Sequence, residues 1–291
     1  MKNIKLKGCG TALVTPFRDG AVDYDAFRNL VRLQVEAGID FLLPLGTTGE
    51  TPCLTNEERR RILQITKEEA GSIPVIVGGG TNSLAGTLES MAALDDLDPD
   101  AYLIVVPYYN KPTQEGMYQY FKAVAAGTDK PVILYNVPGR TGVNMKSETT
   151  LRLAREVENI VAVKEASGNY FQALEIIKDA PQGFDVLCGD DDLTYQMMAA
   201  GGSGVISVAS NIVPAQLVQM THLLLEGKKD QADAINNSLK KLYKACFVES
   251  NPIPTKAALN LMGLCEYEFR LPLCPGLEST TNLMKEVLAE L

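Results

Sequence analysis

The sequence contains no tryptophan and only one histidine, His222, among its 291 residues. A single histidine disfavours His-dependent catalytic triads and His-ligated metal sites. His222 lies within the apolar helical pattern Leu217–Leu225, and we interpret it as a residue on a helix face. The six cysteines are scattered and include no C-x-x-C pair, which favours reduced thiols in a cytoplasmic protein over a disulfide framework or a zinc site.

Cationic residues and long apolar runs are also scarce. The 27 Lys and Arg are outnumbered by 36 Asp and Glu, which gives a net charge of −9. An acidic surface argues against nucleic acid and anionic membranes as partners. No apolar run approaches the roughly 20 residues that a membrane helix needs. Met1–Gly10 is basic, but no apolar core follows it, so we do not interpret it as a signal peptide.

What is present is a regular alternation of strand and helix patterns. Eight short β-type runs recur about every 30 residues, a spacing typical of βα units. They are Thr11–Val14, Phe41–Leu45, Val75–Val77, Ala101–Val106, Val132–Tyr135, Ile160–Lys164, Asp185–Cys188 and Gly204–Val208. The helix patterns between and after them are Tyr24–Ala37, Asn56–Ala70, Ser83–Leu94, Thr113–Ala126, Ser147–Val157, Tyr170–Ala180, Asp192–Ala200 and Pro214–Leu225.

Eight such alternations predict an α/β fold of the (β/α)8 TIM-barrel type over residues 1–227. Residues 228–291 predict about three further helices, Asp230–Val248, Pro254–Met262 and Gly276–Leu291, which we interpret as a C-terminal helical layer packed on the barrel. A doubly wound open sheet is the alternative. It rarely needs eight repeats, and no G-x-G-x-x-G follows the first strand.

The run Ile160–Lys164 ends in a lysine, followed by a loop of small residues. Burial disfavours the charged form of a lysine, and a neutral amine attacks carbonyls to form Schiff bases. The alternative is a lysine that merely ends a strand and reaches solvent. Barrel enzymes place their chemistry at the carboxyl ends of the strands, so the predicted fold favours the catalytic interpretation of Lys164.

Hydroxyl groups, phenols and an arginine follow the other predicted strands, in Gly46–Glu50, Pro107–Asn110 and Tyr135–Gly142. Each has an ordinary explanation as a turn or a core aromatic residue, but the barrel brings them to one face. Tyr135, Thr47 and Tyr109 can relay protons where histidine is missing. Thr48 and Arg140 can hold carboxylates. The pattern predicts small keto-acid substrates and carbon–carbon chemistry through an enamine.

At these residues the sequence resembles the dihydrodipicolinate synthase family. The motifs are Gly46-Thr-Thr-Gly-Glu, Tyr135-Asn-Val-Pro-Gly-Arg-Thr-Gly and Val163-Lys-Glu-Ala-Ser-Gly, and the likeness extends over nearly the whole chain. N-acetylneuraminate lyases and 2-keto-3-deoxy sugar-acid aldolases belong to the same superfamily and remain the alternative. Two threonines in the first motif, an intact Pro-Gly-Arg and the Pro107-Tyr-Tyr-Asn segment favour the synthase.

The resemblance implies a lyase that condenses pyruvate with L-aspartate 4-semialdehyde in lysine biosynthesis through diaminopimelate, with neither a metal nor an organic cofactor. It implies Lys164 as the Schiff-base residue and Tyr135, Thr47 and Tyr109 as the proton relay, with Tyr109 donated across a dimer interface. It also implies substrate-binding roles for Thr48, Arg140, Gly189 and Ile206. The expected assembly is a homotetramer, a dimer of dimers.

Two local patterns invite other interpretations. Gly78–Asn82 resembles a phosphate cradle but lacks the lysine of a P-loop, so we interpret it as a turn. Asp190–Asp192 suits a cation, although such a run more often caps the following helix. Two other classes of protein also remain open: a metal-dependent class II aldolase and a catalytically inactive ligand-sensing barrel.

The resemblance also bears on feedback inhibition by lysine. In lysine-sensitive members the inhibitor sits at the dimer interface, and Tyr108 and Asn82 match that cleft. A glutamate of the sensitive enzymes is replaced by Gly86, and a histidine by Arg59. We therefore predict weak or absent inhibition by lysine. Glu89 and Glu57 remain alternative acidic partners for the inhibitor.

Overall fold

The computed structural model describes residue 4 and residues 6–291, and within them eight parallel strands form one sheet that closes on itself. The strands are β1 (Gly8–Ala12), β4 (Phe41–Leu43), β5 (Ile76–Gly78), β6 (Ala101–Val105), β7 (Val132–Asn136), β8 (Ile160–Glu165), β9 (Asp185–Cys188) and β10 (Gly204–Ser207). They lie in the order β4-β1-β10-β9-β8-β7-β6-β5. A parallel bridge between Leu42 and Val75 joins the two outer strands and completes the barrel.

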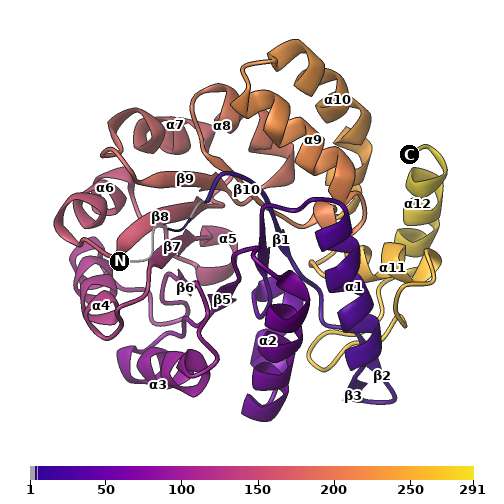
Figure 1. Cartoon of the computed structure of the whole chain (residues 1–291), viewed down its shortest axis with the longest axis horizontal. Coiled ribbons are helices and arrows are strands. Elements are labelled where there is room, and N and C mark those ends of the chain that lie inside the picture. The colour runs from indigo at the N-terminus through magenta and orange to yellow at the C-terminus, as the bar shows by residue number, and fades with distance from the viewer. Residues whose placement is uncertain (1–3, 5) are drawn as a thin grey trace.

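Helices surround the strands as an outer ring (Figure 1). They are α1 (Tyr24–Glu36), α2 (Asn56–Ala70), α3 (Leu84–Asp95), α4 (Gln114–Ala126), α6 (Ser147–Glu156), α7 (Tyr170–Asp179), α8 (Thr194–Ala199) and α9 (Pro214–Leu225). The TIM-barrel prediction is therefore confirmed. Every described helix is too short or too polar to traverse a lipid bilayer.

Alternation along each strand separates the inside of the barrel from its outside. On β7, Ile133 and Tyr135 belong to the cluster that fills the interior, whereas Leu134 packs outward against the helices. On β8 the same period of two places Ala162 inside and Val163 outside, so Lys164 points inward. Lys164 thus lies at the top of a packed core.

The first strand begins earlier than predicted, at Gly8 instead of Thr11. Glycines are poor strand formers, but β1 pairs with β4 and β10 on its two sides. Gly10 is also required there, because a Cβ atom at this position would lie 1.9 Å from the ring of Phe41. Close packing of two strands, which local propensity does not report, sets this boundary.

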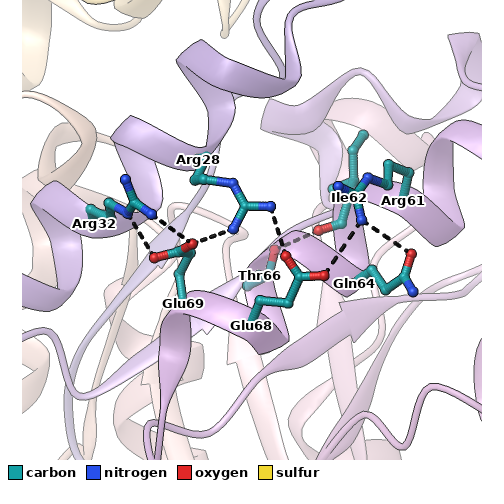
Figure 2. A network of polar contacts seen from close by, with 8 residues as sticks. All are labelled: Arg28, Arg32, Arg61, Ile62, Gln64, Thr66, Glu68 and Glu69. Atoms are coloured by element: carbon teal, nitrogen blue, oxygen red, sulfur yellow. Dashed lines mark hydrogen bonds and ion pairs between the residues drawn. The ribbon is translucent and has the colours of Figure 1, made fainter.

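On the outer face, α1 and α2 are joined by a network of arginine and glutamate side chains (Figure 2). Arg28 contacts Glu69 and donates to Glu68 at 2.6 Å, and Arg32 donates to Glu69 at 2.7 Å. At the start of α2, Thr55 and Glu58 form the reciprocal pair of a capping box. The exposed pairs of this network contribute little stability, whereas the side chains of Arg28 and Glu69 are only 23% and 15% exposed.

Three more helices follow the barrel, namely α10 (Lys229–Ala245), α11 (Ile253–Leu261) and α12 (Glu278–Ala289). Helix α10 packs beside α9, and α12 packs against both α10 and α11. The predicted helical layer is therefore present, although its boundary at residue 228 stays a prediction. Sequence patterns did not show the hairpin of β2 (Phe17–Arg18) and β3 (Ala21–Val22), or helix α5 (Pro138–Thr141), because these elements are only two to four residues long.

Candidate active site

A pocket of about 380 Å³ opens at the carboxyl ends of the strands. It brings together six of the eight residues that the sequence nominated: Thr47, Thr48, Tyr135, Arg140, Lys164 and Gly189. These residues come from four separate segments of the chain, which only closure of the barrel unites. The mouth is covered in part by α10, which contributes Tyr243 and Lys244 to the lining.

Lys164 is the central group of this pocket. Its side chain points into the barrel from β8, opposite Tyr135 of β7 and Leu187 of β9 in the strand register. The residue is only 6% exposed, so the interpretation of a lysine that simply reaches solvent is wrong. Its Nζ lies 4.6 Å from the centre of the Tyr135 ring, and no described residue forms a hydrogen bond or ion pair with it. No described side chain therefore ties Nζ down.

Gly189 makes room for that lysine. A Cβ atom at this position would lie 2.9 Å from Cε of Lys164 and 2.6 Å from Cβ of Ala166. Any other residue would push the lysine stem aside. A glycine is thus required here by the space that the side chains of Lys164 and Ala166 occupy.

Thr48 and Arg140 are linked through Asn251, a residue to which sequence reasoning had assigned no role. Asn251 donates from Nδ2 to the Thr48 hydroxyl at 2.9 Å, and its backbone carbonyl accepts from Nη2 of Arg140 at 3.1 Å. Asn251 is 5% exposed and precedes α11. Its only sequence signal was its place in the Asn251–Lys256 segment of the family resemblance.

A buried ion pair holds the carboxyl end of the loop that carries Thr47 and Thr48. Glu50 follows the short turn Thr47–Gly49, and its carboxylate receives Nζ of Lys256 from α11 at 2.5 Å. Both side chains are almost fully buried, at 1% and 0% exposure. Burial lowers the pKa of Lys256, and the carboxylate of Glu50 partly offsets this effect. Sequence reasoning had assigned Lys256 no role.

Two nominated residues lie outside the pocket. Tyr109 is 88% exposed and has a φ of 71°, and its side chain points into solvent. Ile206 is fully buried in the cluster inside the barrel and does not line the pocket. The isolated chain therefore assembles Tyr135 and Thr47 at the lysine, but not Tyr109.

Asp190 and Asp191, in the acidic run after β9, have different surroundings. Asp190 lines the pocket, accepts from the backbone N–H of Asp192 at 3.2 Å as a cap, and has a pKa raised by burial. Asp191 is buried and accepts from the N–H groups of Val208 and Ala209, both at 3.0 Å. Burial also raises the pKa of Asp191. Among residue 4 and residues 6–291, no group of three or more His, Cys, Asp or Glu is placed to hold a metal ion.

A second pocket, of about 360 Å³, adjoins the first and shares Thr47, Tyr135 and Arg140 with it. It extends to Tyr108 and Arg59. Arg59 donates from Nη2 to Ser90 at 2.6 Å, while its buried Nε has no partner among the described atoms. Burial lowers the pKa of Arg59. This second pocket therefore contains a cationic group without a carboxylate beside it.

A buried lysine at the mouth of a TIM barrel, next to a tyrosine and threonines, defines the class of lyases that work through a Schiff base. The dihydrodipicolinate synthetase family model matches residues 5–291, and the chain belongs to this family. It is 49% identical to the 4-hydroxy-tetrahydrodipicolinate synthase of Phocaeicola vulgatus, over 100% of this chain and 99% of the relative.

Solved structures agree with this assignment. The dihydrodipicolinate synthase of Thermotoga maritima superposes with a TM-score of 0.97 at 45% identity, over 99% of both chains. The enzyme of Cyanidioschyzon merolae, solved with lysine bound, gives a TM-score of 0.94 at 39% identity over 98% of this chain and 97% of that one.

Proposed function

We propose that this chain is a 4-hydroxy-tetrahydrodipicolinate synthase that condenses pyruvate with L-aspartate 4-semialdehyde, a step of lysine biosynthesis through diaminopimelate. The observation that carries the proposal is Lys164, a buried amine without an ion-pair partner among the described residues, in a chain whose curated relatives have this name. The same names disfavour the N-acetylneuraminate lyase and sugar-acid aldolase alternatives.

The geometry supports a mechanism in defined steps. Nζ of Lys164 attacks C2 of pyruvate, and the carbinolamine loses water to give an iminium ion. Loss of a proton from C3 then gives an enamine, which attacks the aldehyde carbon of the second substrate. The amino group of that substrate finally attacks C2 and displaces Lys164, which closes the ring and regenerates the free amine.

The remaining pocket residues support these steps. The phenol of Tyr135 and the hydroxyl of Thr47 line the pocket and accept and return the protons, a task for which its lining offers no histidine. Thr48 holds the pyruvate carboxylate. Arg140 lies at the pocket lining with an exposed side chain and offers a bidentate fork to the carboxylate of the semialdehyde. The chemistry needs no metal or organic cofactor.

The exposed Tyr109 supports an oligomeric enzyme. A phenol that points away from its own pocket is suited to complete the proton relay of a neighbouring subunit. We propose a homotetramer built from two such dimers, in which Gly189 contacts substrate through backbone atoms. Ile206 is buried inside the barrel, outside the pocket lining, so we assign it no contact with substrate. A cytoplasmic location fits the six free cysteines and the biosynthetic role.

The test is reductive trapping. Incubation with pyruvate and borohydride should add one reduced pyruvate unit to the peptide that contains Lys164, and Lys164→Ala should abolish the label. Turnover should be measured with pyruvate and L-aspartate 4-semialdehyde, beside cleavage of N-acetylneuraminate and with a chelator present. Labelling at another lysine, no turnover of the semialdehyde, or loss of activity in chelator would each refute a part of the proposal.

A further inference from the structure

A buried polar cluster lies directly behind the two central residues of the pocket. Glu165 is the last residue of β8 and follows Lys164, and Asn136 is the last residue of β7 and follows Tyr135. The register pairs Tyr135 with Lys164 and Asn136 with Glu165. Because side chains alternate along a strand, Glu165 and Asn136 point away from the pocket toward the outer helices.

Glu165 is a carboxylate held entirely by neutral donors. It is 3% exposed and forms no ion pair with any described residue. Nδ2 of Asn136 donates to its two oxygens at 3.2 and 3.1 Å, Nε2 of Gln172 donates at 3.1 Å, and the N–H of Ser167 donates at 2.8 Å. A buried carboxylate is tolerated only when its oxygens are satisfied in this way, and losing one donor is costly.

The cluster also holds the loop that carries Arg140. The side-chain oxygen of Asn136 accepts from the N–H of Met145 at 3.0 Å, and its amide donates to Asn144 at 2.8 Å. Asn144 in turn donates to Gln172 of α7 at 2.7 Å. Both ends of the 137–144 segment are therefore attached to the same cluster. Residue 137 is covalently joined to Asn136, and Asn144 is hydrogen-bonded to Asn136 and Gln172.

We propose that Glu165 and Asn136 are positioning residues that set the relative placement of Lys164, Tyr135 and the Arg140 loop. This inference rests on the proposed function. It explains why a carboxylate without a cation is kept beside the reactive lysine: a single acceptor group gathers donors from the strand end, the following loop and α7. Apolar side chains in place of Glu165 and Asn136 would fill the same space, but they would form no directional bonds that fix the distance between the ends of β7 and β8.

The first test is Glu165→Gln, which has the same shape but places an amide donor toward the donors of Asn136 and Gln172. Small displacements of reacting groups cost up to about 100-fold in rate. The rate of borohydride trapping by pyruvate, measured well below the melting temperature, should fall roughly 10- to 100-fold. Glu175→Gln is the matched control, since Glu175 lies on α7, the helix that also carries Gln172, and its carboxylate accepts a hydrogen bond from Ser147 instead of from the cluster. Its trapping rate should be unchanged.

The reciprocal variant Glu165→Gln with Asn136→Asp separates positioning from stability. The carboxylate introduced at position 136 accepts from the amide introduced at position 165, so the hydrogen bond is restored with its direction reversed. Part of the lost trapping rate should therefore return. If Glu165→Gln fails to fold, Asn144→Ala replaces it and should raise KM for the semialdehyde by loosening the Arg140 loop.

Three results would overturn the inference: an unchanged trapping rate with a lowered melting temperature in Glu165→Gln, no recovery in the folded double variant, or unchanged kinetics in Asn144→Ala. The parent chain keeps this test separate from the proposed function. If the parent is not labelled by pyruvate at all, the proposed function fails. If the parent is labelled and Glu165→Gln is labelled equally fast, only the positioning role fails.

Discussion

Substituting Lys256 by methionine should destabilise the protein strongly. Nζ of Lys256 contacts the carboxylate of Glu50 at 2.5 Å, donates to the carbonyl of Glu268 at 3.0 Å, and lies 4.3 Å from the ring centre of Phe17. Methionine keeps an unbranched side chain as far as Cε but removes the terminal cation. The carboxylate of Glu50, 1% exposed, then remains as an uncompensated buried charge.

Breaking a buried ion pair by removing one partner costs about 3–5 kcal/mol. For a chain of this size, each kcal/mol shifts the melting temperature by about 2–4 °C, so we expect a drop of about 6–20 °C. The double variant Lys256→Met with Glu50→Gln should recover part of this loss, because no buried charge is left unpaired.

Thermal unfolding followed by circular dichroism measures the effect. The control is Lys241→Met, which removes the cation of the Lys241–Glu290 pair, whose side chains are 69% and 56% exposed. Exposed pairs contribute at most about 1 kcal/mol, so the control should melt close to the parent. If Lys256→Met matched the control, or if the double variant melted below the single one, the reasoning about the buried charge would be wrong.

Three further predictions concern activity. Arg140→Ala should raise KM for the semialdehyde while pyruvate trapping continues at Lys164, and equal loss of both steps would show a structural role for Arg140. Mixing Tyr109→Phe chains with Lys164→Ala chains should restore some activity through hybrid dimers, and no recovery after confirmed subunit exchange would contradict a shared site. The free amino acid lysine should inhibit only weakly, because Arg59 puts a cation in the second pocket and Gly86 offers no carboxylate for the ammonium group. Half-inhibition well below about 1 mM would refute this prediction.

The sequence predicted the parts of the fold that local patterns determine. Helices α2 and α9 begin and end where their apolar periodicity and caps indicated, at Asn56–Ala70 and Pro214–Leu225. The first strand was misplaced because its glycines owe their position to Phe41 of the neighbouring strand. Contacts between strands leave no trace in local periodicity.

The site was predictable to a similar extent. Lys164 and Tyr135 could be predicted because each is a polar residue at the end of an apolar strand pattern, where the fold itself does not need an amine or a phenol. Asn251 was not, since its bond to Thr48 spans 203 residues of sequence, and an asparagine in a loop is ordinary by itself. Tyr109 points away from its own pocket, so its proposed role requires a second chain.

These long-range contacts change how the C-terminal layer is understood. From helix patterns alone, residues 228–291 are predicted to be a layer appended to a barrel that is already complete. The structure instead shows Asn251 bonded to Thr48 and Arg140, and Lys256 buried against the carboxylate that follows the Thr47–Gly49 turn. The layer thus supplies the hydrogen bonds and the charge that hold two proposed carboxylate-binding groups in place. Lys164 comes from the barrel, but the geometry of its pocket depends on the helices that follow the barrel.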